Sequence, residues 1–390
     1  MKEIIKYITT FLLYGNEEAT QWVGYTDETS QFNQYRVVII PSGNLGKHIV
    51  LPDMSQPSVE LLSSNENASH KTYIIHTDII YNAFFFISRA EELITSQRDE
   101  HGRFLAKHSI LGQNNRLMIP LLDEYARLLM KLVDLPLPTP SFSQIYLTHD
   151  VDSIANYRHL RGTIGGIIRG KHKEVVAALK DIHNDPAFTF SWLITQDKII
   201  ENAQCIYFVK NTNGRGYDYP QYNLLSNDYQ KASQLIANSE AQIGLHSSYY
   251  GTIKTEHIPS PHLHRSHYLR CSIDQMQRLA DAGITDDFTM MFADCIGFRI
   301  QTARPVRWIN PKTMQLTSLT LHPLTVMDCT LSNDNYMNLT EDEAYFYCQR
   351  LFEKIHQNSG EIVLLWHNTN PTNNTYHRTL YPKLLELLNR

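Results

Sequence analysis

From residue 143 onward the chain alternates short apolar runs with amphipathic stretches, and this alternation limits the folds that are open to it. Runs rich in β-branched and aromatic residues predict buried strands, whereas apolar residues at intervals of three and four predict helices. The predicted strands span residues 144–147, 204–209, 241–245, 288–292, 319–328 and 361–368, and the predicted helices 175–183, 190–196, 224–239, 273–282 and 341–357. Strands separated by helices pair in parallel, so residues 143–390 are expected to form a parallel β/α barrel.

A proline-rich break at Pro136–Ser141 separates this region from residues 1–138, which are expected to form an N-terminal domain of mixed α/β class. The predicted elements of this domain are a helix over residues 1–14, strands over 35–43 and 72–80, and helices over 81–94 and 121–133. Two charged stretches, 88–92 and 98–104, are interpreted as a solvated helix end and a solvated loop. No catalytic residue is predicted in this domain.

The charge of the whole chain argues against polyanion binding as its main function. Forty acidic residues against 35 basic ones give a net charge of -5 with His neutral, which provides no long-range attraction to nucleic acid or an anionic membrane. Five dispersed cysteines without C-x-x-C spacing indicate a reducing compartment. No apolar run reaches the roughly 18 residues that span a bilayer, and the start of the chain suits an amphipathic helix better than a signal peptide. The expected location is the cytoplasm.

The first candidate site residues follow the strand that opens the C-terminal region. Asp150 and Asp152 stand two residues apart, and alternate side chains of an extended segment point the same way, so both carboxylates are expected at one site. Two like charges this close are costly unless a cation or a proton lies between them. A divalent metal at the mouth of the barrel resolves this repulsion, and a solvated Asp-x-Asp turn is the alternative.

Two other predicted strands also end in residues that bind metals or transfer protons, namely His246 and His367. Asp152 and His246 are suited to hold a divalent cation, with Zn as the preferred ion. Asp150 would then stay off the metal as general base, and His367 would protonate the leaving group. This combination suits the hydrolysis of an amide or an ester.

The same residues resemble the motifs of the polysaccharide deacetylases of the NodB-homology type. The segments that carry the resemblance are Thr148–Asp152, Ile206–Val209, Ile243–His246, Tyr268–Arg270 with the helix that ends at Gly283, and Leu364–His367. In this family the first motif supplies a base Asp and a metal Asp, the second a metal His, and the last an acid His. The resemblance covers residues 143–370 and implies a distorted β/α barrel that removes acetyl groups from carbohydrates.

The whole chain is similar to a bacterial subgroup of deacetylase-like proteins that carry an extra N-terminal domain. The segments similar to the signatures of this subgroup are Phe84–Glu92, Arg98–Phe104, His267–Arg270, Gly297–Arg299 and Pro323–Asp328. For this subgroup the resemblance implies a fold and not an established substrate.

The sequence departs from the family at one metal ligand. The second motif of the family offers another His four residues after the first, and that place is occupied by Tyr250. His267 is the candidate for the missing ligand, because it precedes the third-motif segment that should line the same mouth. His257 and His264 are less favoured, because their Pro/His-rich loop has no predicted rigid anchor. A surface position is the alternative for all three histidines.

Further residues are candidates for positions around the metal. Arg270 is expected to orient Asp150 through a charge-assisted pair, with Arg299 as its rival. The other residues considered for the mouth are Asp328, Tyr249 and Trp366. Structural roles are the alternative for these three, and for the tryptophan a core position is preferred over a sugar-stacking role.

The expected function is the metal-dependent removal of an acetyl group from an N- or O-acetylated sugar or polysaccharide precursor. One alternative is a non-catalytic relative that binds a glycan or a partner in surface-polysaccharide assembly. The other is metal-dependent hydrolysis of a non-sugar amide. The metal content separates the enzyme from the binding protein, and the acyl product released separates the two hydrolases.

Overall fold

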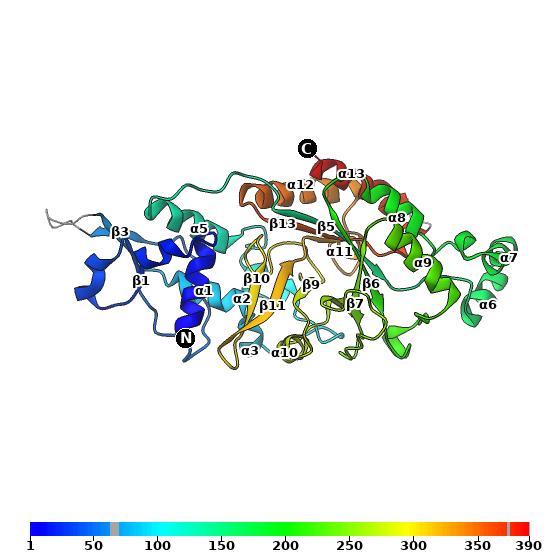
Figure 1. Ribbon diagram of the computed structural model, residues 1–390, viewed down its shortest axis with the longest axis horizontal. Coiled ribbons are helices and arrows are strands. Elements are labelled where there is room, and N and C mark those ends of the chain that lie inside the picture. Colours follow the sequence, from blue (N-terminus) through cyan, green and yellow to red (C-terminus); the bar gives the residue numbers. More distant parts are fainter. Residues whose placement is uncertain (63–69, 373–374, 390) are drawn as a thin grey trace.

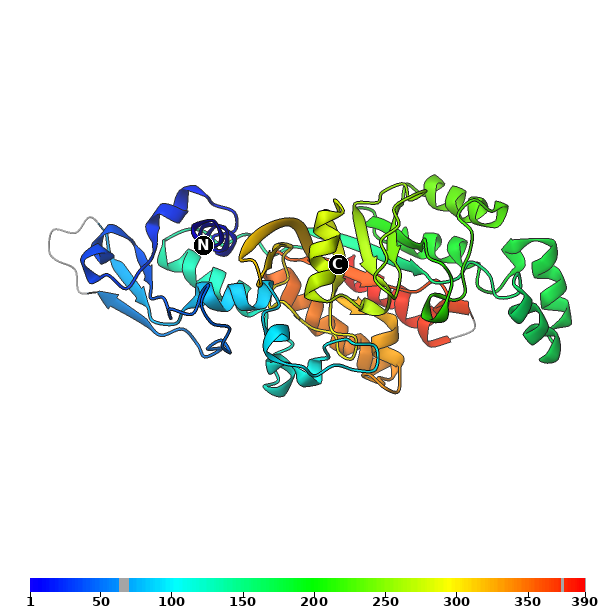
Figure 2. The same ribbon diagram turned by 90° about the horizontal axis from the view of Figure 1, so that it is seen from below.

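The computed structural model describes residues 1–62, 70–372 and 375–389 and shows an elongated molecule of mixed α/β class (Figure 1). Its described residues form two sheets, a smaller one in the N-terminal region and a larger one in the C-terminal region. Figure 2 shows the N-terminal region at one end of the long axis. No helix among the described residues is long and apolar enough to cross a membrane.

In the part of the chain that is described, the smaller sheet has four strands in the order β1-β2-β4-β3. Their bounds are β1 Val23–Tyr25, β2 Val37–Ile39, β3 Val59–Leu62 and β4 Thr72–Ile75. The β1/β2 and β2/β4 pairs are parallel, whereas β3 runs antiparallel to β4 at the edge. The predicted strands 35–43 and 72–80 are therefore present but shorter than expected.

The larger sheet has nine strands among the described residues, in the order β10-β11-β9-β8-β7-β6-β5-β13-β12. Their bounds are β5 Gln144–Val151, β6 Gln204–Lys210, β7 Gln242–Ser247, β8 Leu263–Ser266, β9 Asp286–Met290, β10 Val306–Asn310, β11 Gln315–Pro323, β12 Val326–Met327 and β13 Glu361–Leu365. All neighbours pair in parallel except β10 and β11. Parallel pairing brings the carboxyl ends of β5, β7, β8 and β13 to one edge of the sheet.

Helices pack around both sheets. Their bounds are α1 Lys2–Leu12, α2 Ile79–Ile87, α3 Glu91–Ile94, α4 Ile110–Gln113, α5 Leu121–Leu132, α6 Leu160–Ile168, α7 His172–Lys180, α8 Phe190–Asp197, α9 Asn227–Asn238, α10 Ile273–Asp281, α11 Asp328–Ser332, α12 Glu341–Gln357 and α13 Thr375–Leu388. In Figure 1 the helices α8, α12 and α13 lie along the upper side of the larger sheet, and α10 lies below it. The helix α12 has the predicted bounds and the predicted capping box of Thr340 and Glu343.

The larger sheet is strongly curved. The Phe288 ring on β9 lies 5.1 Å from Tyr146 on β5, 5.6 Å from Phe208 on β6 and 4.3 Å from His322 on β11, measured between ring centroids. His322 also lies 2.9 Å from Glu361 on β13, so strands that are far apart in the strand order meet through their side chains. Among the described residues no backbone pairing joins the end strands β10 and β12. The structure thus shows a curved mixed sheet, and the distorted barrel stays a prediction.

One hydrophobic core runs through both regions. The cluster includes Ile8 and Phe85 from the N-terminal region and Trp308 from β10. A buried ion pair joins Asp123 of α5 to Arg304, with 2.8 Å between Oδ1 and Nε. The proposed boundary near residue 138 is therefore crossed by apolar packing and by a buried salt bridge.

The charged stretches of the N-terminal region differ from the interpretation as solvated segments, wholly for 88–92 and in part for 98–104, where Arg103 and Phe104 are buried. The predicted helix 81–94 is interrupted at Arg89, whose φ of 60° separates α2 from α3. The Glu92 carboxylate is buried between Arg89 and Arg299, each 2.7 Å away. Burial opposes its charge, but the two guanidinium groups hold the pKa of Glu92 at about 2. A charged segment can be buried when its partners come from a distant part of the chain, and a sequence pattern does not show those partners.

The histidine-rich stretch 257–265 also differs from its interpretation as an unanchored loop. Its last residues form β8, which is central in the sheet between β7 and β9. His264 is fully buried, with Nδ1 2.7 Å from Asp287 Oδ1 and Nε2 2.9 Å from Ser247 Oγ. The polar side chains of this strand are tolerated in the interior because neighbouring strands supply their hydrogen-bond partners.

Candidate metal centre

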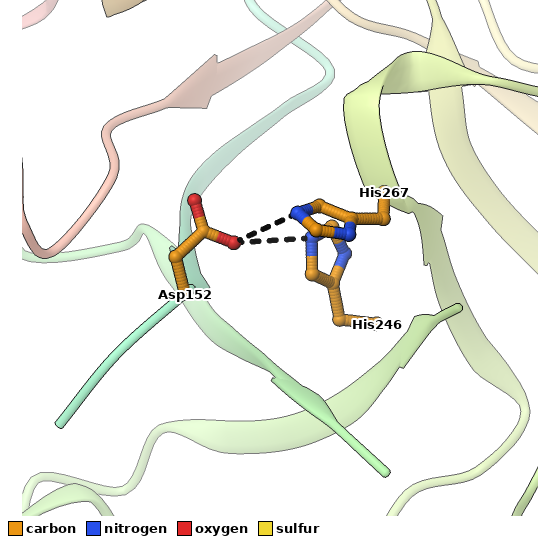
Figure 3. Close-up of side chains that lie close together, drawn as sticks. All are labelled: Asp152, His246 and His267. Carbon is orange, nitrogen blue, oxygen red and sulfur yellow. Dashed lines mark ion pairs between the residues drawn. The ribbon is translucent and has the colours of Figure 1, made fainter. Parts of the chain in front are cut away.

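Three side chains capable of binding a metal converge at the carboxyl edge of the larger sheet. Asp152 follows β5, His246 lies on β7, and His267 follows β8. Nε2 of His267 lies 3.3 Å from Oδ1 of Asp152, and Nε2 of His246 lies 3.7 Å from the same oxygen (Figure 3). One potential ligand atom from each residue lies within 4.8 Å of the other two.

In both histidines the ring nitrogen that does not face Asp152, which is Nδ1, has a contact of its own. Nδ1 of His246 lies 3.1 Å from the carbonyl oxygen of Arg265, which fixes the ring with Nε2 toward Asp152. Nδ1 of His267 lies 3.2 Å from the Asp218 carboxylate, which in turn accepts hydrogen bonds from Ser248 and Tyr249. Contacts of this kind orient the histidines of metal sites and set their tautomer.

Two polar atoms at the point of convergence have no hydrogen-bond partner among the described residues. They are Oδ1 of Asp152 and Nε2 of His246, and both are buried. Buried polar atoms are rarely left in this state. Burial also holds the pKa of His246 well below its usual value, so its ring is neutral and Nε2 carries a free lone pair. Two imidazole nitrogens and a carboxylate oxygen form a donor set that fits a divalent ion such as Zn.

Asp150 lies beside these three residues and is almost completely buried. Its Oδ2 lies 3.6 Å from His246 Nε2, and its Oδ1 lies 3.6 Å from Nη1 of Arg265. Burial raises the pKa of Asp150, and the Arg265 charge counteracts part of this rise. A buried carboxylate next to a candidate metal site is suited to accept a proton.

The structure corrects the assignment of the arginine that pairs with Asp150. Nε of Arg270 donates to the carbonyl oxygen of His101, and its Nη1 donates to that of Tyr249. The rival Arg299 is bound to Glu92. The arginine beside Asp150 is instead Arg265 on β8, which is fully buried and also donates from Nη2 to Thr148 Oγ1 at 2.9 Å. Sequence reasoning missed this arginine because it did not predict β8.

His367 lies across the site at the end of β13. Its Nε2 lies 4.0 Å from Asp150 Oδ2 and 4.0 Å from Asp152 Oδ2. Both its backbone N–H and its Nδ1 contact the Asp328 carboxylate, at 2.8 and 2.7 Å. Burial opposes a charged ring, but the Asp328 carboxylate outweighs it and holds the pKa of His367 well above its usual value. Asp328 is fully buried, and its two contacts hold the His367 ring with Nε2 toward the Asp pair.

Lys210 at the end of β6 was not singled out from the sequence. Its Nζ lies 3.9 Å from Asp152 Oδ1, and the side chain is almost fully buried. Burial lowers the pKa of this ammonium group. The only sequence signal was a charged residue directly after the predicted apolar strand 204–209. The pairing of Val151 with Val209 places this lysine level with Asp152.

A cavity of about 590 Å³ opens above the site. Its lining includes Asp150, Asp152, Lys210, His267 and His367 together with Tyr217, Tyr219, Tyr268, Tyr336 and Arg103. The three residues considered for the mouth from the sequence are buried and do not belong to this lining: Asp328, Tyr249 and Trp366. Tyr250, which stands in the place of the expected second histidine, is exposed. The contribution of Arg103 shows that the N-terminal region supplies part of the cavity wall.

The segment that carries Arg103 holds the backbone next to His267. Nη1 of Arg103 donates to the carbonyl oxygen of Tyr268 at 3.2 Å, and its Nη2 donates to Tyr336. Tyr268 and Leu269 have φ angles of 60° and 53°, a left-handed conformation that is rare for such residues. Unusual backbone of this kind persists when its surroundings hold it in place, and it clusters at functional sites.

Comparisons with known proteins found a family model and a solved structure that are each similar to part of this chain. Residues 4–137 match the model of a family described as a family of unknown function (DUF7033). None of the curated proteins matches the chain. The solved structures include a "putative polysaccharide deacetylase" from Mycobacterium smegmatis, with 15% sequence identity, a TM-score of 0.40, and coverage of 65% of this chain and 87% of that chain. With a TM-score this low, the function has to be argued from the geometry of the site.

Proposed function

We propose that this protein is a metal-dependent hydrolase that removes an acetyl group from an N- or O-acetylated sugar or polysaccharide precursor. One observation carries the proposal, namely that buried Asp152 Oδ1 and His246 Nε2 lack hydrogen-bond partners among the described residues and converge with His267. This donor set lies between Asp150 and His367, which have the properties of a base and an acid. The motif resemblance to polysaccharide deacetylases supports the same reaction.

In this proposal Asp152, His246 and His267 hold a divalent ion, with Zn as the first candidate. When bound, such an ion polarises a carbonyl group and lowers the pKa of water. Asp150 accepts the proton of the attacking water, and Arg265 keeps its carboxylate in place. His367, held protonated by Asp328, donates a proton to the departing nitrogen or oxygen.

The cavity supports a carbohydrate as the substrate. Its wall is mainly polar and includes four tyrosines, which offer flat faces for sugar rings and hydroxyl groups for hydrogen bonds. A volume of about 590 Å³ lies within the range of small-molecule sites and suits a short stretch of glycan. Both N- and O-acetyl groups are compatible with this chemistry.

The fold and the location of the protein are expected to follow the same family. We assign residues 143–390 to a distorted β/α barrel of the deacetylase type and residues 1–138 to an extra N-terminal domain of mixed α/β class, as in the bacterial subgroup that the sequence resembles. The curvature that brings His322 to Glu361 supports the barrel. The five cysteines are all free, which supports a cytoplasmic location.

Metal content tests the site. Purified full-length protein, equilibrated with Zn²⁺ and desalted, is expected to retain about one ion per chain by elemental analysis. His267→Ala and Asp152→Asn should lose it with the circular dichroism spectrum unchanged, whereas His262→Ala, an exposed histidine beside β8, should not. Unchanged metal content in His267→Ala would refute the site.

Acetate release tests the reaction. The loaded protein is expected to release acetate from N- or O-acetylated oligosaccharides, and Asp150→Asn should keep the metal and lose at least 100-fold in rate, in line with the roughly 10²–10⁴-fold contribution of a general base. Full activity in Asp150→Asn would refute the assignment of the base. Metal binding without acetate release from any acetylated sugar would favour the non-catalytic binding protein.

A further inference from the structure

The helices α6 and α7 form a hairpin that projects from one end of the molecule (Figure 1). Figure 2 shows the same hairpin at the end of the long axis opposite the N-terminal region. It has a small core of its own, made by Tyr157, Val175 and Ala178, separate from the main core. The outer faces of both helices are therefore free of packing against the main body.

The outer face of α6 is a stripe of exposed aliphatic side chains. Leu160, Ile164, Ile167 and Ile168 are 76%, 48%, 43% and 79% exposed. Their spacing of four, three and one residues places them on one side of the helix. On α7, Val176 and Leu179 are 51% and 49% exposed. Exposed aliphatic residues that gather on one element mark an interaction surface, whereas scattered ones carry no such meaning.

The hairpin is basic although the chain as a whole is acidic. Residues 158–180 contain six Arg and Lys side chains and a single carboxylate, Glu174, in a chain with a net charge of -5. Arg158 pairs with Asp228 and Lys171 pairs with Glu174. The cations of the hairpin with no ion pair among the described residues are Arg161, Arg169, Lys173 and Lys180. The surface thus combines an aliphatic stripe with unpaired positive charge.

The hairpin begins at the rim of the candidate active site. His159, the residue before α6, lines the cavity and lies 3.1 Å from the hydroxyl group of Tyr219, another lining residue. The guanidinium of Arg161 lies 5.2 Å from the Tyr219 ring. The aliphatic stripe starts one residue after His159, so whatever binds the stripe lies next to the mouth of the cavity.

We propose that this hairpin docks on the surface of a lipid bilayer that contains anionic phospholipids. Helices with an aliphatic face and flanking Lys and Arg residues lie in the interface of such bilayers, with the apolar face among the upper acyl chains and the cations at the phosphates. The long-range field of the whole chain is weak, so the docking depends on the local charge of the hairpin. The docked hairpin holds the cavity beside the bilayer surface, where glycans attached to lipids are presented.

Vesicle sedimentation tests the docking. The full-length protein is mixed with vesicles of phosphatidylcholine alone or with about one third phosphatidylglycerol, at low and high salt. Binding to the anionic vesicles is expected to exceed binding to the neutral ones by at least tenfold and to weaken as salt rises, because each surface cation contributes about a fivefold factor. No binding to anionic vesicles, or equal binding to both, would overturn the proposal.

Variants of the hairpin test whether its aliphatic and basic residues bind the vesicles. Ile164→Glu/Ile168→Glu and Lys173→Glu/Lys180→Glu are each expected to lose at least tenfold in binding to anionic vesicles, while their metal content stays that of the wild type. The matched control Leu51→Glu/Phe346→Glu changes two exposed apolar residues far from the hairpin, which are 56% and 61% exposed, and should bind as the wild type does. Equal loss in this control, or none in the hairpin variants, would overturn the assignment.

The oligomeric state distinguishes a protein occupant from a membrane. If a bilayer is the occupant, light scattering is expected to give the same molar mass for the wild type and for Ile164→Glu/Ile168→Glu. A dimer that dissociates in this variant, together with no vesicle binding, would assign the stripe to a second copy of the chain and refute the proposal. Neither result depends on hydrolase activity, so failure of the docking and failure of the proposed function are separate outcomes.

Discussion

At the scale of single residues, the candidate site depends on buried charges whose partners come from different strands. Asp150 on β5 is paired with Arg265 on β8, and both are buried. Removing one partner of a buried pair leaves the other charge without compensation, which costs more than the pair itself contributes. Arg265 therefore has a role in folding as well as in holding the proposed base.

The change Arg265→Met is expected to lower the free energy of unfolding by about 3 kcal/mol, because Asp150 stays buried without its cation. Loss of the cation should also raise the pKa of Asp150 further above its usual value. Urea denaturation at neutral pH measures the first effect. The control Arg350→Met, at an exposed position of α12, should be nearly neutral. Stability should recover in part in Arg265→Met/Asp150→Asn, and no recovery would contradict the pairing.

At the scale of elements, the segment 98–104 acts on the site from the N-terminal region. Arg103 is held by Asp99, with 2.7 Å between Nη2 and Oδ2, and it donates to the carbonyl oxygen of Tyr268. Tyr268 directly follows His267, so this contact fixes the left-handed backbone beside a candidate metal ligand. The N-terminal region thus has a structural part in the site, although the family that it matches has no described function.

The change Arg103→Ala is expected to weaken Zn²⁺ binding about tenfold, because the backbone next to His267 loses the hydrogen bond from Arg103 to the Tyr268 carbonyl oxygen. Isothermal titration of the metal-free protein with Zn²⁺ measures the change. Lys107→Ala, an exposed cation four residues further along, is the matched control and should leave the affinity unchanged. Equal affinity in wild type and Arg103→Ala would show that the segment has no influence on the ligand.

At the scale of the whole molecule, the two regions share one core, and we expect them to unfold as one unit. The hydrogen bonds that cross between them include Leu122 N–H to the Gln301 carbonyl oxygen and Phe298 N–H to the Leu117 carbonyl oxygen, at 2.9 and 2.7 Å. Apolar side chains of α1 and α2 belong to the same cluster as those of the larger sheet. Separating the regions would expose this surface to water.

A fragment of residues 143–390 is therefore expected to lack a stable fold. Its near-ultraviolet circular dichroism should be weak, and it should aggregate in size-exclusion chromatography, whereas the full chain should unfold in a single cooperative transition. Adding the separately produced fragment 1–138 is the control and should restore solubility. A monomeric, cooperatively unfolding 143–390 fragment would contradict a shared folding unit and favour independent domains.

The buried contact between His322 and Glu361, which the curvature of the larger sheet brings together, predicts that the stability of the protein depends on pH. Burial opposes a charge on His322, but Glu361 and Asp286 raise the pKa of His322 to about 9 from 6.5. The stability from this charge is complete below the unfolded value of 6.5 and is lost as the pH rises through about 9. The free energy of unfolding should fall by about 3 kcal/mol over that interval, at 1.4 kcal/mol per pKa unit. Urea titrations at several pH values measure this slope.

His322→Gln should remove this slope, since glutamine does not titrate in this range. His356→Gln, at an exposed position of α12, is the matched control and should keep it. A slope that persists in His322→Gln would show that other groups cause it, and that the contact of His322 with Glu361 across the curved sheet adds little to stability.

Local elements were predictable where neighbouring residues decide them. The helix α12 has the predicted bounds because its capping box and apolar spacing are encoded within one segment. The strand β6 was predicted from a short unbroken apolar run, which is typical of a strand that is buried on both faces of a parallel sheet. In contrast β8 was not predicted, because Leu263–Ser266 is mostly polar and is buried only through partners on other strands.

The sequence by itself determined the mixed α/β class and the residue types at the strand ends, because both depend on local periodicity and on side-chain chemistry. Only the tertiary structure decided which of these residues meet. It brought His267 to Asp152 and His246, replaced Arg270 by Arg265 beside Asp150, and placed Arg103 in the cavity wall. The physical reason is that a buried charge or histidine is stabilised by partners on other strands, and strand order, which local sequence does not encode, selects those partners.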